Sequence, residues 1–255
     1  MQKGHALEQL IRESFENSSK RTDKYDSYYK SYAKILENKI SANNTAQSIK
    51  LLEIGVKDGG SLEAWRKILG NKSLVVGLDK NPECLNFDSE QHRVIIGDQN
   101  NLTTWQSIVT EFGTFDVIID DGSHIGSSQS RTIDLALKIA IGEEGIVIIE
   151  DTHTAYIDRY FGDGHGMNFM DKVKDIAARM NARSGRIADH EFSKLAYVKP
   201  NDIARRSIEC ISMYESITAF YIKRNLKDSK RCGSDGQENI PRIKDLRKET
   251  NNENS

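Results

Sequence analysis

The sequence predicts a doubly wound, Rossmann-like α/β domain, in which a mostly parallel sheet of seven strands lies between two layers of helices. Between residues 50 and 151, short apolar runs alternate with amphipathic helical segments, as parallel strands with crossover helices require. Polar residues gather directly after these apolar runs. Two later runs follow one another almost without a linker, which predicts a closing antiparallel hairpin.

The composition agrees with a single domain of this class. The chain has 255 residues and a net charge of −2, and this balance provides no electrostatic footprint for nucleic acid or a membrane surface. No apolar run reaches the ~20 residues of a membrane-spanning helix, and the first residues lack the apolar segment of a signal peptide. The three cysteines, Cys84, Cys210 and Cys232, are scattered, which favours a reducing cytoplasm over disulfides or a zinc cluster.

Residues 1–45 are predicted to form a helical segment that acts as a lid or as packing. The stretch ALEQLIRESF has apolar residues at helical spacing. A second amphipathic face follows it, which comprises Tyr28, Tyr29, Tyr32, Ile35, Leu36 and Ile40. We interpret these tyrosines as packing residues and not as chemical groups.

Residues 46–225 hold the predicted strands and form the expected cofactor-binding catalytic domain. The five parallel strands are predicted at 50–56, 73–79, 92–98, 115–121 and 145–151. Helices are predicted at 62–69, 102–112, 131–140 and 168–182. The hairpin strands are predicted at 208–215 and 217–224.

Residues 226–255 have almost no periodic apolar pattern, and their basic and acidic residues are interleaved. We expect a polar, flexible tail with a short helix around Ile240–Leu246.

The turn after the first strand is rich in small residues. Gly55 permits a tight turn and a close approach by a ligand, and Gly59, Gly60 and Ser61 open the next helix. The pattern lacks the GxGxxG spacing of dinucleotide-binding enzymes, so an ordinary strand-to-helix turn is an equal alternative.

The next two strands also end in polar residues. Asp79 lies ~20 residues beyond the glycines, where an acid typically binds a ribose hydroxyl. Asp98 and Gln99 end the third strand and are suited to hydrogen bonds with a purine edge. These strand tips share the carboxyl edge of the sheet, where α/β domains bind ligands.

The fourth and fifth strands end in Asp120-Asp121 and Glu150-Asp151. If the two strands are neighbours, their tips lie ~5 Å apart. Carboxylates this close repel one another and raise each other's pKa, and Mg²⁺ relieves that conflict with oxygen ligands. The alternative is that these acids cap the following helices. Two acidic pairs on adjacent tips favour a metal site with Asp121, Glu150 and Asp151 as ligands. Asp120 is not assigned to the metal, and its alternative role is a structural one in the turn.

His124 stands three residues after Asp121. A lone histidine is usually a packed or surface side chain. A hydroxyl bound to Mg²⁺ becomes more acidic, however, and an imidazole with a pKa of ~6.5 can take its proton near neutral pH. His153, two residues past Asp151, competes for this role or orients a ligand.

The acid-led strand tips and the closing hairpin resemble the class I S-adenosylmethionine-dependent methyltransferases. The resemblance implies that Glu53 and Gly55 lie by the methionine part of the cofactor, Asp79 by the ribose, and Asp98 and Gln99 by the adenine. A NAD-dependent reductase is the rival, but the missing third glycine and the hairpin count against it.

A narrower resemblance rests on LLEIGVKDGGSLEAW, GLDKNP, GDQNN, FDVIIDDGSH, GIVIIEDTHTAY and CISMYESITAFYIKR. These segments, and TDKYDSYYKSY before them, look like metal-dependent sugar O-methyltransferases of natural-product pathways, which act on mycinamicin- and tylosin-type macrolide sugars or on rhamnosyl groups. The resemblance covers about residues 20–225. It implies that Asp121, Glu150 and Asp151 hold Mg²⁺ and that His124 is the general base. Catechol-type methyltransferases have a lysine base at the corresponding position.

The implied activity is O-methylation of a sugar hydroxyl on a small-molecule acceptor, with S-adenosylmethionine and Mg²⁺ as cofactors. A catechol or phenol O-methyltransferase and a non-catalytic, cephalosporin-hydroxylase-like binding protein remain alternatives. Nucleic-acid and membrane partners are not expected, and a homo-oligomer remains open. The segment IDRYFGDGHGMNFM is short and we expect no separate domain before residue 50, so the acceptor pocket is the part that transfers least from the family.

Overall fold

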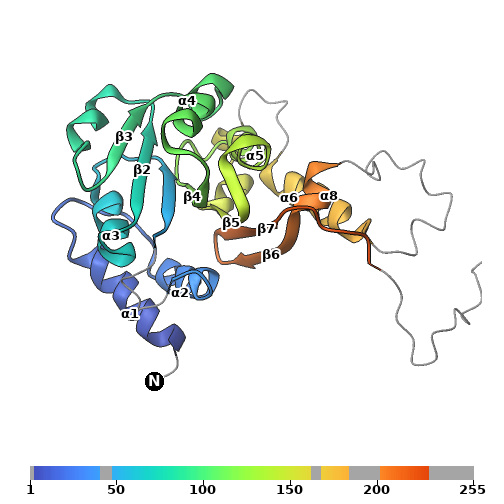
Figure 1. The fold of residues 1–255 in the computed structure, drawn as a ribbon, viewed down its shortest axis with the longest axis horizontal. Coiled ribbons are helices and arrows are strands. Elements are labelled where there is room, and N and C mark those ends of the chain that lie inside the picture. Colours follow the sequence, from blue (N-terminus) through green and yellow to red (C-terminus); the bar gives the residue numbers. More distant parts are fainter. Residues whose placement is uncertain (1–2, 41–47, 162–167, 184–201, 230–255) are drawn as a thin grey trace, which may run out of the picture.

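The sheet is the organising feature of the computed structural model, which describes residues 3–40, 48–161, 168–183 and 202–229. Its seven strands follow the order β3-β2-β1-β4-β5-β7-β6, with helices on both faces (Figure 1). The predicted tail from residue 230 onward, including the helix expected around Ile240–Leu246 and Cys232, lies outside the described residues.

The strands confirm the predicted fold class. β1 (Lys50–Ile54), β2 (Leu74–Asp79), β3 (Arg93–Ile96), β4 (Phe115–Asp120) and β5 (Ile141–Ile149) pair in parallel. β7 (Ile217–Lys223) is antiparallel to β5 and to β6 (Ile208–Tyr214), and so forms the closing hairpin. Most residues of the central strands are apolar because helices cover both of their faces, and Glu53 of β1 and Asp120 of β4 are buried exceptions.

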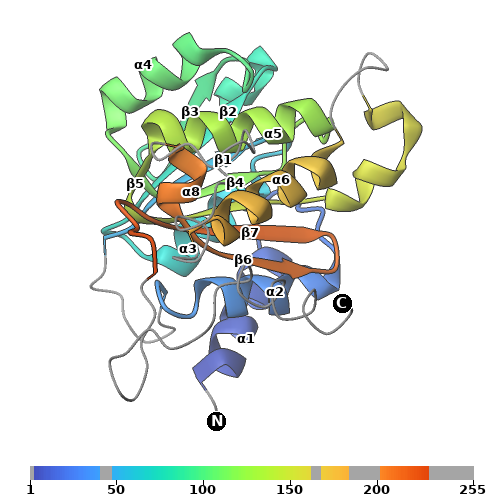
Figure 2. The ribbon, with the colours of Figure 1, turned by 90° about the vertical axis from the view of Figure 1, so that its right-hand side faces the viewer.

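One face of the sheet is covered by α1 (Lys3–Glu16), α2 (Asp26–Leu36) and α3 (Gly60–Leu69), as Figure 2 shows. Side chains from these helices and from the strands share one buried cluster, to which Ile11, Tyr32, Trp65 and Val117 belong. The N-terminal helices are therefore built into the core of the domain. Residues 17–25 between them are mostly non-helical.

The other face is covered by α4 (Leu102–Phe112), α5 (Gly126–Leu135), α6 (Phe169–Asn181) and the short α8 (Ile203–Ser207). A π-helical turn, Ala136–Ala140, continues α5 into β5. Short 3₁₀ helices follow β2 (Pro82–Phe87) and β5 (Thr152–Tyr156 and Asp158–Tyr160). The helices of this face bury a second apolar cluster against the sheet.

The register of the parallel strands determines which side chains meet at the carboxyl edge. Ile54 of β1 pairs with Asp120 of β4, and Asp120 pairs with Ile149 of β5. The residues that follow, Asp121 and Glu150, therefore leave the sheet side by side. This confirms that the two acid-ended strands are neighbours.

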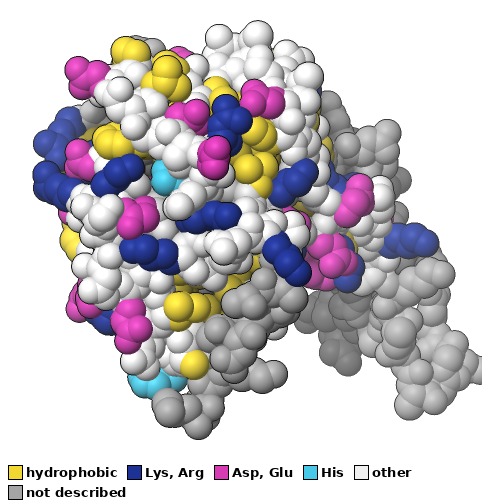
Figure 3. All heavy atoms as spheres, turned by 60° about the vertical axis from the view of Figure 1, so that its left-hand side comes forward, with side chains coloured by type: hydrophobic (Ala, Val, Ile, Leu, Met, Phe, Trp, Pro, Cys, Tyr) yellow, Lys and Arg dark blue, Asp and Glu magenta, His cyan; other side chains and the backbone are white. Residues whose placement is uncertain are grey.

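The surface carries charges of both signs. On the face shown in Figure 3, basic and acidic side chains are interspersed without a patch of a single sign. Among the described residues, no helix has the length and apolar character needed to cross a bilayer.

Candidate active site

A cleft of about 670 Å³ lies at the carboxyl edge of the sheet, a volume within the range of small-molecule sites. Its walls come from residues 21–25 before α2, the β1–α3 turn, the end of β2 with the residues after it, and the loops after β4 and β5. His124, Asp151, Gly55 and Asp79 all line it. The predicted cofactor half and the predicted acidic half thus open into the same cleft.

Gly55 in the β1–α3 turn is required by packing inside the protein. Its φ is +95°, and a Cβ atom there would lie 2.1 Å from the carbonyl oxygen of Asp121. The sequence predicts a close approach by a ligand at this position, whereas the atom that approaches is the backbone of the neighbouring turn. Gly55 therefore allows the β1–α3 turn to pack closely against the turn that follows β4.

Asp79 lies on the cleft wall with its carboxylate partly engaged. Oδ2 accepts hydrogen bonds from the backbone N–H groups of Val56 (2.8 Å) and Lys57 (3.2 Å), and Oδ1 accepts one from Asn81 (2.9 Å). Burial alone would raise the pKa of Asp79, but these three donors lower it below its ordinary value. The ionised carboxylate shapes the β1–α3 turn and retains acceptor capacity toward the cleft.

Glu53 lies behind the cleft wall. It is fully buried and accepts hydrogen bonds from the Ser61 hydroxyl (2.6 Å) and the Trp65 indole N–H (3.4 Å). Burial raises its pKa to about 7. Ser61 itself lines the cleft, so Glu53 acts on the site by orienting that hydroxyl.

The residues predicted for the adenine do not line the cleft. Asp98 is exposed and accepts a hydrogen bond from the backbone N–H of Asn100 (2.8 Å). Gln99 is buried, and its amide nitrogen donates to Asp120 (3.1 Å) and Thr132 (3.2 Å) while its oxygen accepts from Ser123 N–H. This side chain supports the acidic turn, and its geometry does not favour the predicted contact with a purine.

The acidic turns of β4 and β5 meet around a buried lysine that the sequence interpretation overlooks. Lys24 Nζ lies 2.6 Å from Asp121 Oδ2 and 2.7 Å from Glu150 Oε2, and its side chain is 3% exposed. The Tyr32 hydroxyl donates to the second oxygen of Glu150. Burial would lower the pKa of Lys24, but Asp121 and Glu150 raise it well above its ordinary value. Burial raises the pKa of Glu150 to about 8, and the charge of Asp121 adds to this effect.

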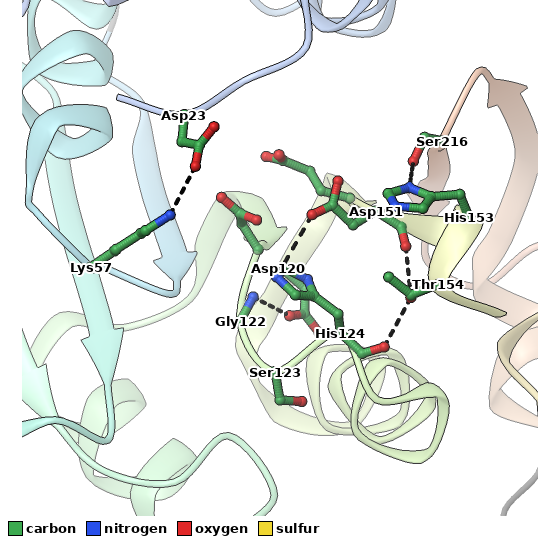
Figure 4. Close-up of polar contacts among 12 residues, drawn as sticks. Asp23, Lys57, Asp120, Gly122, Ser123, His124, Asp151, His153, Thr154 and Ser216 are labelled. Atoms are coloured by element: carbon green, nitrogen blue, oxygen red, sulfur yellow. Dashed lines mark hydrogen bonds and ion pairs between the residues drawn. The ribbon is translucent and has the colours of Figure 1, made fainter. Parts of the chain in front are cut away.

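Asp151 and His124 form the open side of the same cluster, as Figure 4 shows. Both have left-handed backbone conformations, with φ of +53° and +59°, and His124 Nε2 lies 3.6 Å from Asp151 Oδ2. The Tyr28 hydroxyl donates to Asp151 Oδ1 (2.5 Å), and Thr154 Oγ1 donates to the backbone carbonyl of His124 (3.0 Å). Strained non-glycine residues held by such bonds are common at functional sites.

His153 lies on the far side of Asp151 and is tied to the hairpin. Its Nδ1 is 2.5 Å from Ser216 Oγ (Figure 4). The Tyr28 hydroxyl lies 2.9 Å from the same Ser216 oxygen. Through Ser216 and Tyr28, His153 belongs to the residues that support Asp151. His124 comes from the turn after β4 and faces Asp151 in the turn after β5.

The donor atoms of Asp121, His124 and Asp151 lie within 4.8 Å of one another, a spacing that fits a shared metal ion. Oxygen-rich sets of this kind suit Mg²⁺. Glu150 is outside this group because Lys24 and Tyr32 engage both of its oxygens. The structure thus brings together two of the three predicted ligands with the predicted base, and holds the third ligand on a lysine.

The cluster also contains polar groups that the sequence interpretation does not include, from Lys24, Tyr28 and Tyr32. They recur at intervals of four residues, and each donates to one or two of the carboxylates. The tyrosines are interpreted from the sequence as packing residues, and their rings do pack in the core. The available signal was the K-x₃-Y-x₃-Y spacing, which places polar tips on one side of the segment.

No family model matches the chain, but parts of it are similar to curated enzymes. It is 33% identical over 126 residues to demethylmacrocin O-methyltransferase of Streptomyces fradiae, a match that covers 46% of this chain and 31% of the relative. It is 37% identical over 117 residues to mycinamicin VI 2''-O-methyltransferase of Micromonospora griseorubida, which covers 43% and 29%. The matches therefore span less than a third of the length of these relatives.

Among solved structures, the chain is similar to the MycE methyltransferase from the mycinamycin biosynthetic pathway, solved in complex with Mg and SAH. The TM-score is 0.70 with 22% sequence identity, and the match covers 96% of this chain and 60% of that chain. This similarity shows that the chain has the class I methyltransferase fold.

Proposed function

We propose that the protein is a Mg²⁺- and S-adenosylmethionine-dependent O-methyltransferase that acts on a sugar hydroxyl of a glycosylated small molecule. The observation that carries the proposal is the shared cleft, into which both the β1–α3 turn and the cluster of Asp121, His124 and Asp151 open. The similarity to curated sugar O-methyltransferases supports this substrate class.

The cofactor half of the cleft would hold S-adenosylmethionine, which supplies a methyl group on a sulfonium. The turn from Gly55 to Ser61 and the remaining acceptor capacity of Asp79 offer backbone and carboxylate partners for its amino-acid and ribose parts. In this proposal residues 46–225 form the cofactor-binding unit and residues 1–45 pack on it. The free thiols Cys84 and Cys210 agree with a cytoplasmic location.

The acidic half would hold a divalent cation, whose chemistry is to make a bound acceptor hydroxyl more acidic. Asp121 and Asp151 provide the carboxylates for this ion. The imidazole of His124 removes the acceptor proton, and Asp151 orients that ring from 3.6 Å. The freed oxygen would then attack the methyl carbon, so that the C–O bond forms as the C–S bond breaks and S-adenosylhomocysteine leaves. Alignment of the two substrates in one cleft would contribute much of the rate.

The rim of the cleft suits an acceptor with both apolar and polar surface. Tyr25 and Ile157 line the cleft and are 57% and 36% exposed. Tyr160, with Arg159 over its ring, lines the cleft as well. Aromatic rings of this kind pack against the apolar face of a sugar or of the group that carries it.

An acceptor screen tests this function. The full chain is incubated with methyl-labelled S-adenosylmethionine, Mg²⁺ and three sets of acceptors: glycosylated natural products, their aglycones, and catechols. We expect label on the sugar of glycosylated acceptors alone, located by mass spectrometry and NMR. Label on catechols alone would contradict the sugar specificity. Cofactor binding without transfer to any acceptor would support a non-catalytic binding protein.

A further inference from the structure

The ammonium group of Lys24 lies between Asp121, a carboxylate of the proposed cation site, and Glu150, which the sequence predicts as a further ligand of the same ion. We propose that Lys24 is a built-in counter-ion that a divalent cation displaces on binding. The inference rests on the proposed function, because it concerns the same acidic cluster. It implies that the lysine and the divalent cation neutralise these carboxylates in turn and not together.

The contacts of Lys24 are those of a bound cation. Its Nζ lies 2.6 Å from Asp121 Oδ2 and 2.7 Å from Glu150 Oε2, and its side chain is only 3% exposed. The Glu150 side chain is 1% exposed, so without a cation this carboxylate would be buried beside a second one. Burial of unpaired charges costs several kcal/mol, and the lysine removes that cost in the absence of a metal.

Geometry and charge disfavour simultaneous occupancy. Lys24 Nζ lies 2.6 and 2.7 Å from one oxygen of Asp121 and one oxygen of Glu150, and Mg²⁺ binds oxygen at about 2 Å, so a cation held by these same oxygens would lie within ~5 Å of the ammonium group. Two cations at that distance repel strongly in a poorly solvated site. Departure of the ammonium relieves the repulsion and frees Glu150 as a ligand, which would restore the three-acid set predicted from the sequence.

The lysine is placed where it can leave without unfolding the domain. It precedes α2, whereas Tyr28 and Tyr32 within α2 keep their own bonds to Asp151 and Glu150. Lys24 has a long, flexible side chain at the wall of the cleft. In this proposal, that side chain rotates toward the cleft and exposes its ammonium group to solvent.

Cation binding by the full-length protein and two variants tests the proposal. Lys24→Met keeps the length and apolar stem of the side chain but removes its charge. Lys20→Met is the matched control, because Lys20 lies in the same segment over the ring of Phe87. With Mn²⁺ followed by electron paramagnetic resonance, we expect Lys24→Met to bind at least tenfold more tightly than wild type and Lys20→Met to match wild type. Equal or weaker binding by Lys24→Met would overturn the proposal.

A second measurement uses the wild-type chain and reports displacement directly. Lysines are acylated briefly with and without Mg²⁺, and each site is quantified by mass spectrometry. We expect acylation of Lys24 to increase at least fivefold with Mg²⁺ and that of Lys20 to stay constant. If the protein binds the metal but acylation of Lys24 does not increase, the displacement of Lys24 is overturned and the metal-dependent function is not. Failure of wild type and Lys24→Met to bind any Mn²⁺ would overturn both this inference and the metal-dependent function.

Discussion

His124 is the residue whose role depends most on its immediate neighbours. Its left-handed backbone, the Thr154 bond to its carbonyl, and Asp151 at 3.6 Å hold the imidazole beside the acids. A solvent-exposed histidine in an ordinary turn would lack these restraints. The position of the ring is what makes it a general-base candidate, more than its residue type.

Replacement of His124 by alanine should therefore separate binding from chemistry. We expect His124→Ala to bind S-adenosylmethionine as wild type does, by calorimetry, and to lose methyl transfer by about 100-fold or more, as removal of a general base does. His153→Ala is the comparison, because His153 is bonded to Ser216 on the other side of Asp151. If His153→Ala lost turnover and His124→Ala retained it, the base would be His153.

The buried carboxyl of Glu53 makes a specific contribution to the pH dependence of stability. Its pKa is raised by burial from 4.5 to about 7, so between these pH values the folded chain holds a proton that the unfolded chain releases. Stability from this group therefore falls as the pH rises through that window. We expect Glu53→Gln, which cannot ionise, to gain up to ~3 kcal/mol relative to wild type between pH 5 and pH 8 in urea unfolding. A difference between the two proteins that is the same at both pH values would contradict this.

Single residues were predictable from the sequence where the backbone alone determines their position. Asp121, Asp151 and His124 directly follow strand ends, so parallel pairing brings them to one edge whatever their side chains do. The directions of the Glu150 and Gln99 side chains depend on partners distant in sequence, Lys24 and Asp120. Those partners cannot be assigned without the tertiary structure.

At the scale of elements, the same tyrosines of α2 both pack in the core and bind the acids of the cleft. Their rings pack in the core, and the hydroxyl groups of Tyr28 and Tyr32 reach the acids at the strand ends. Apolar periodicity reveals the packing face of a helix, but it does not show which group a tyrosine hydroxyl on that face contacts. The sequence interpretation of these tyrosines as packing residues is therefore correct for the rings and incomplete for the hydroxyls.

Removal of the Tyr32 hydroxyl should destabilise the protein through Glu150. We expect Tyr32→Phe to lower the free energy of unfolding by about 1–3 kcal/mol, because a buried carboxylate loses a donor. Tyr29→Phe is the matched control on the same helix: Tyr29 is 6% exposed, and its hydroxyl has no hydrogen-bond partner among the described residues. Its change should stay within about 0.5 kcal/mol. Equal losses in both variants would show that the Tyr32 bond to Glu150 contributes little.

The ends of the elements also show where local patterns are insufficient. The helix predicted at 131–140 begins earlier, at Gly126, and its last turn is π-helical. Gly126, Ser128 and Ser130 are poor helix formers, so the sequence pattern favours a turn there. In the structure they are buried against neighbouring elements, and this packing outweighs their weak intrinsic preference. The short α8 was missed because five residues are too few for a periodic signal.

For the whole molecule, the order of the strands creates the site. The sheet reverses its direction of winding at β1, with β2 and β3 on one side and β4 and β5 on the other. The β1–α3 turn and the acid-bearing turns after β4 and β5 therefore open into one cleft at this switch point. The alternation of apolar runs and helices predicts a doubly wound parallel sheet, because parallel strands joined by crossovers have few possible arrangements, but it leaves the order of the strands open. The N-terminal wall of the cleft is not predictable in this way, since no rule of strand pairing places Lys24 between the acids.

The central claim is that these turns form one metal-dependent methyl-transfer site, and chelation tests it most directly. Methyl transfer from labelled S-adenosylmethionine to a glycosylated acceptor is measured in wild type and in Asp121→Asn, first in EDTA and then with excess Mg²⁺. We expect EDTA to abolish transfer by wild type and Mg²⁺ to restore it, because Asp121 and Asp151 provide oxygen ligands for the ion. Asp121→Asn should stay at least 100-fold slower at the same Mg²⁺ concentration. Full transfer by wild type in EDTA would contradict the account.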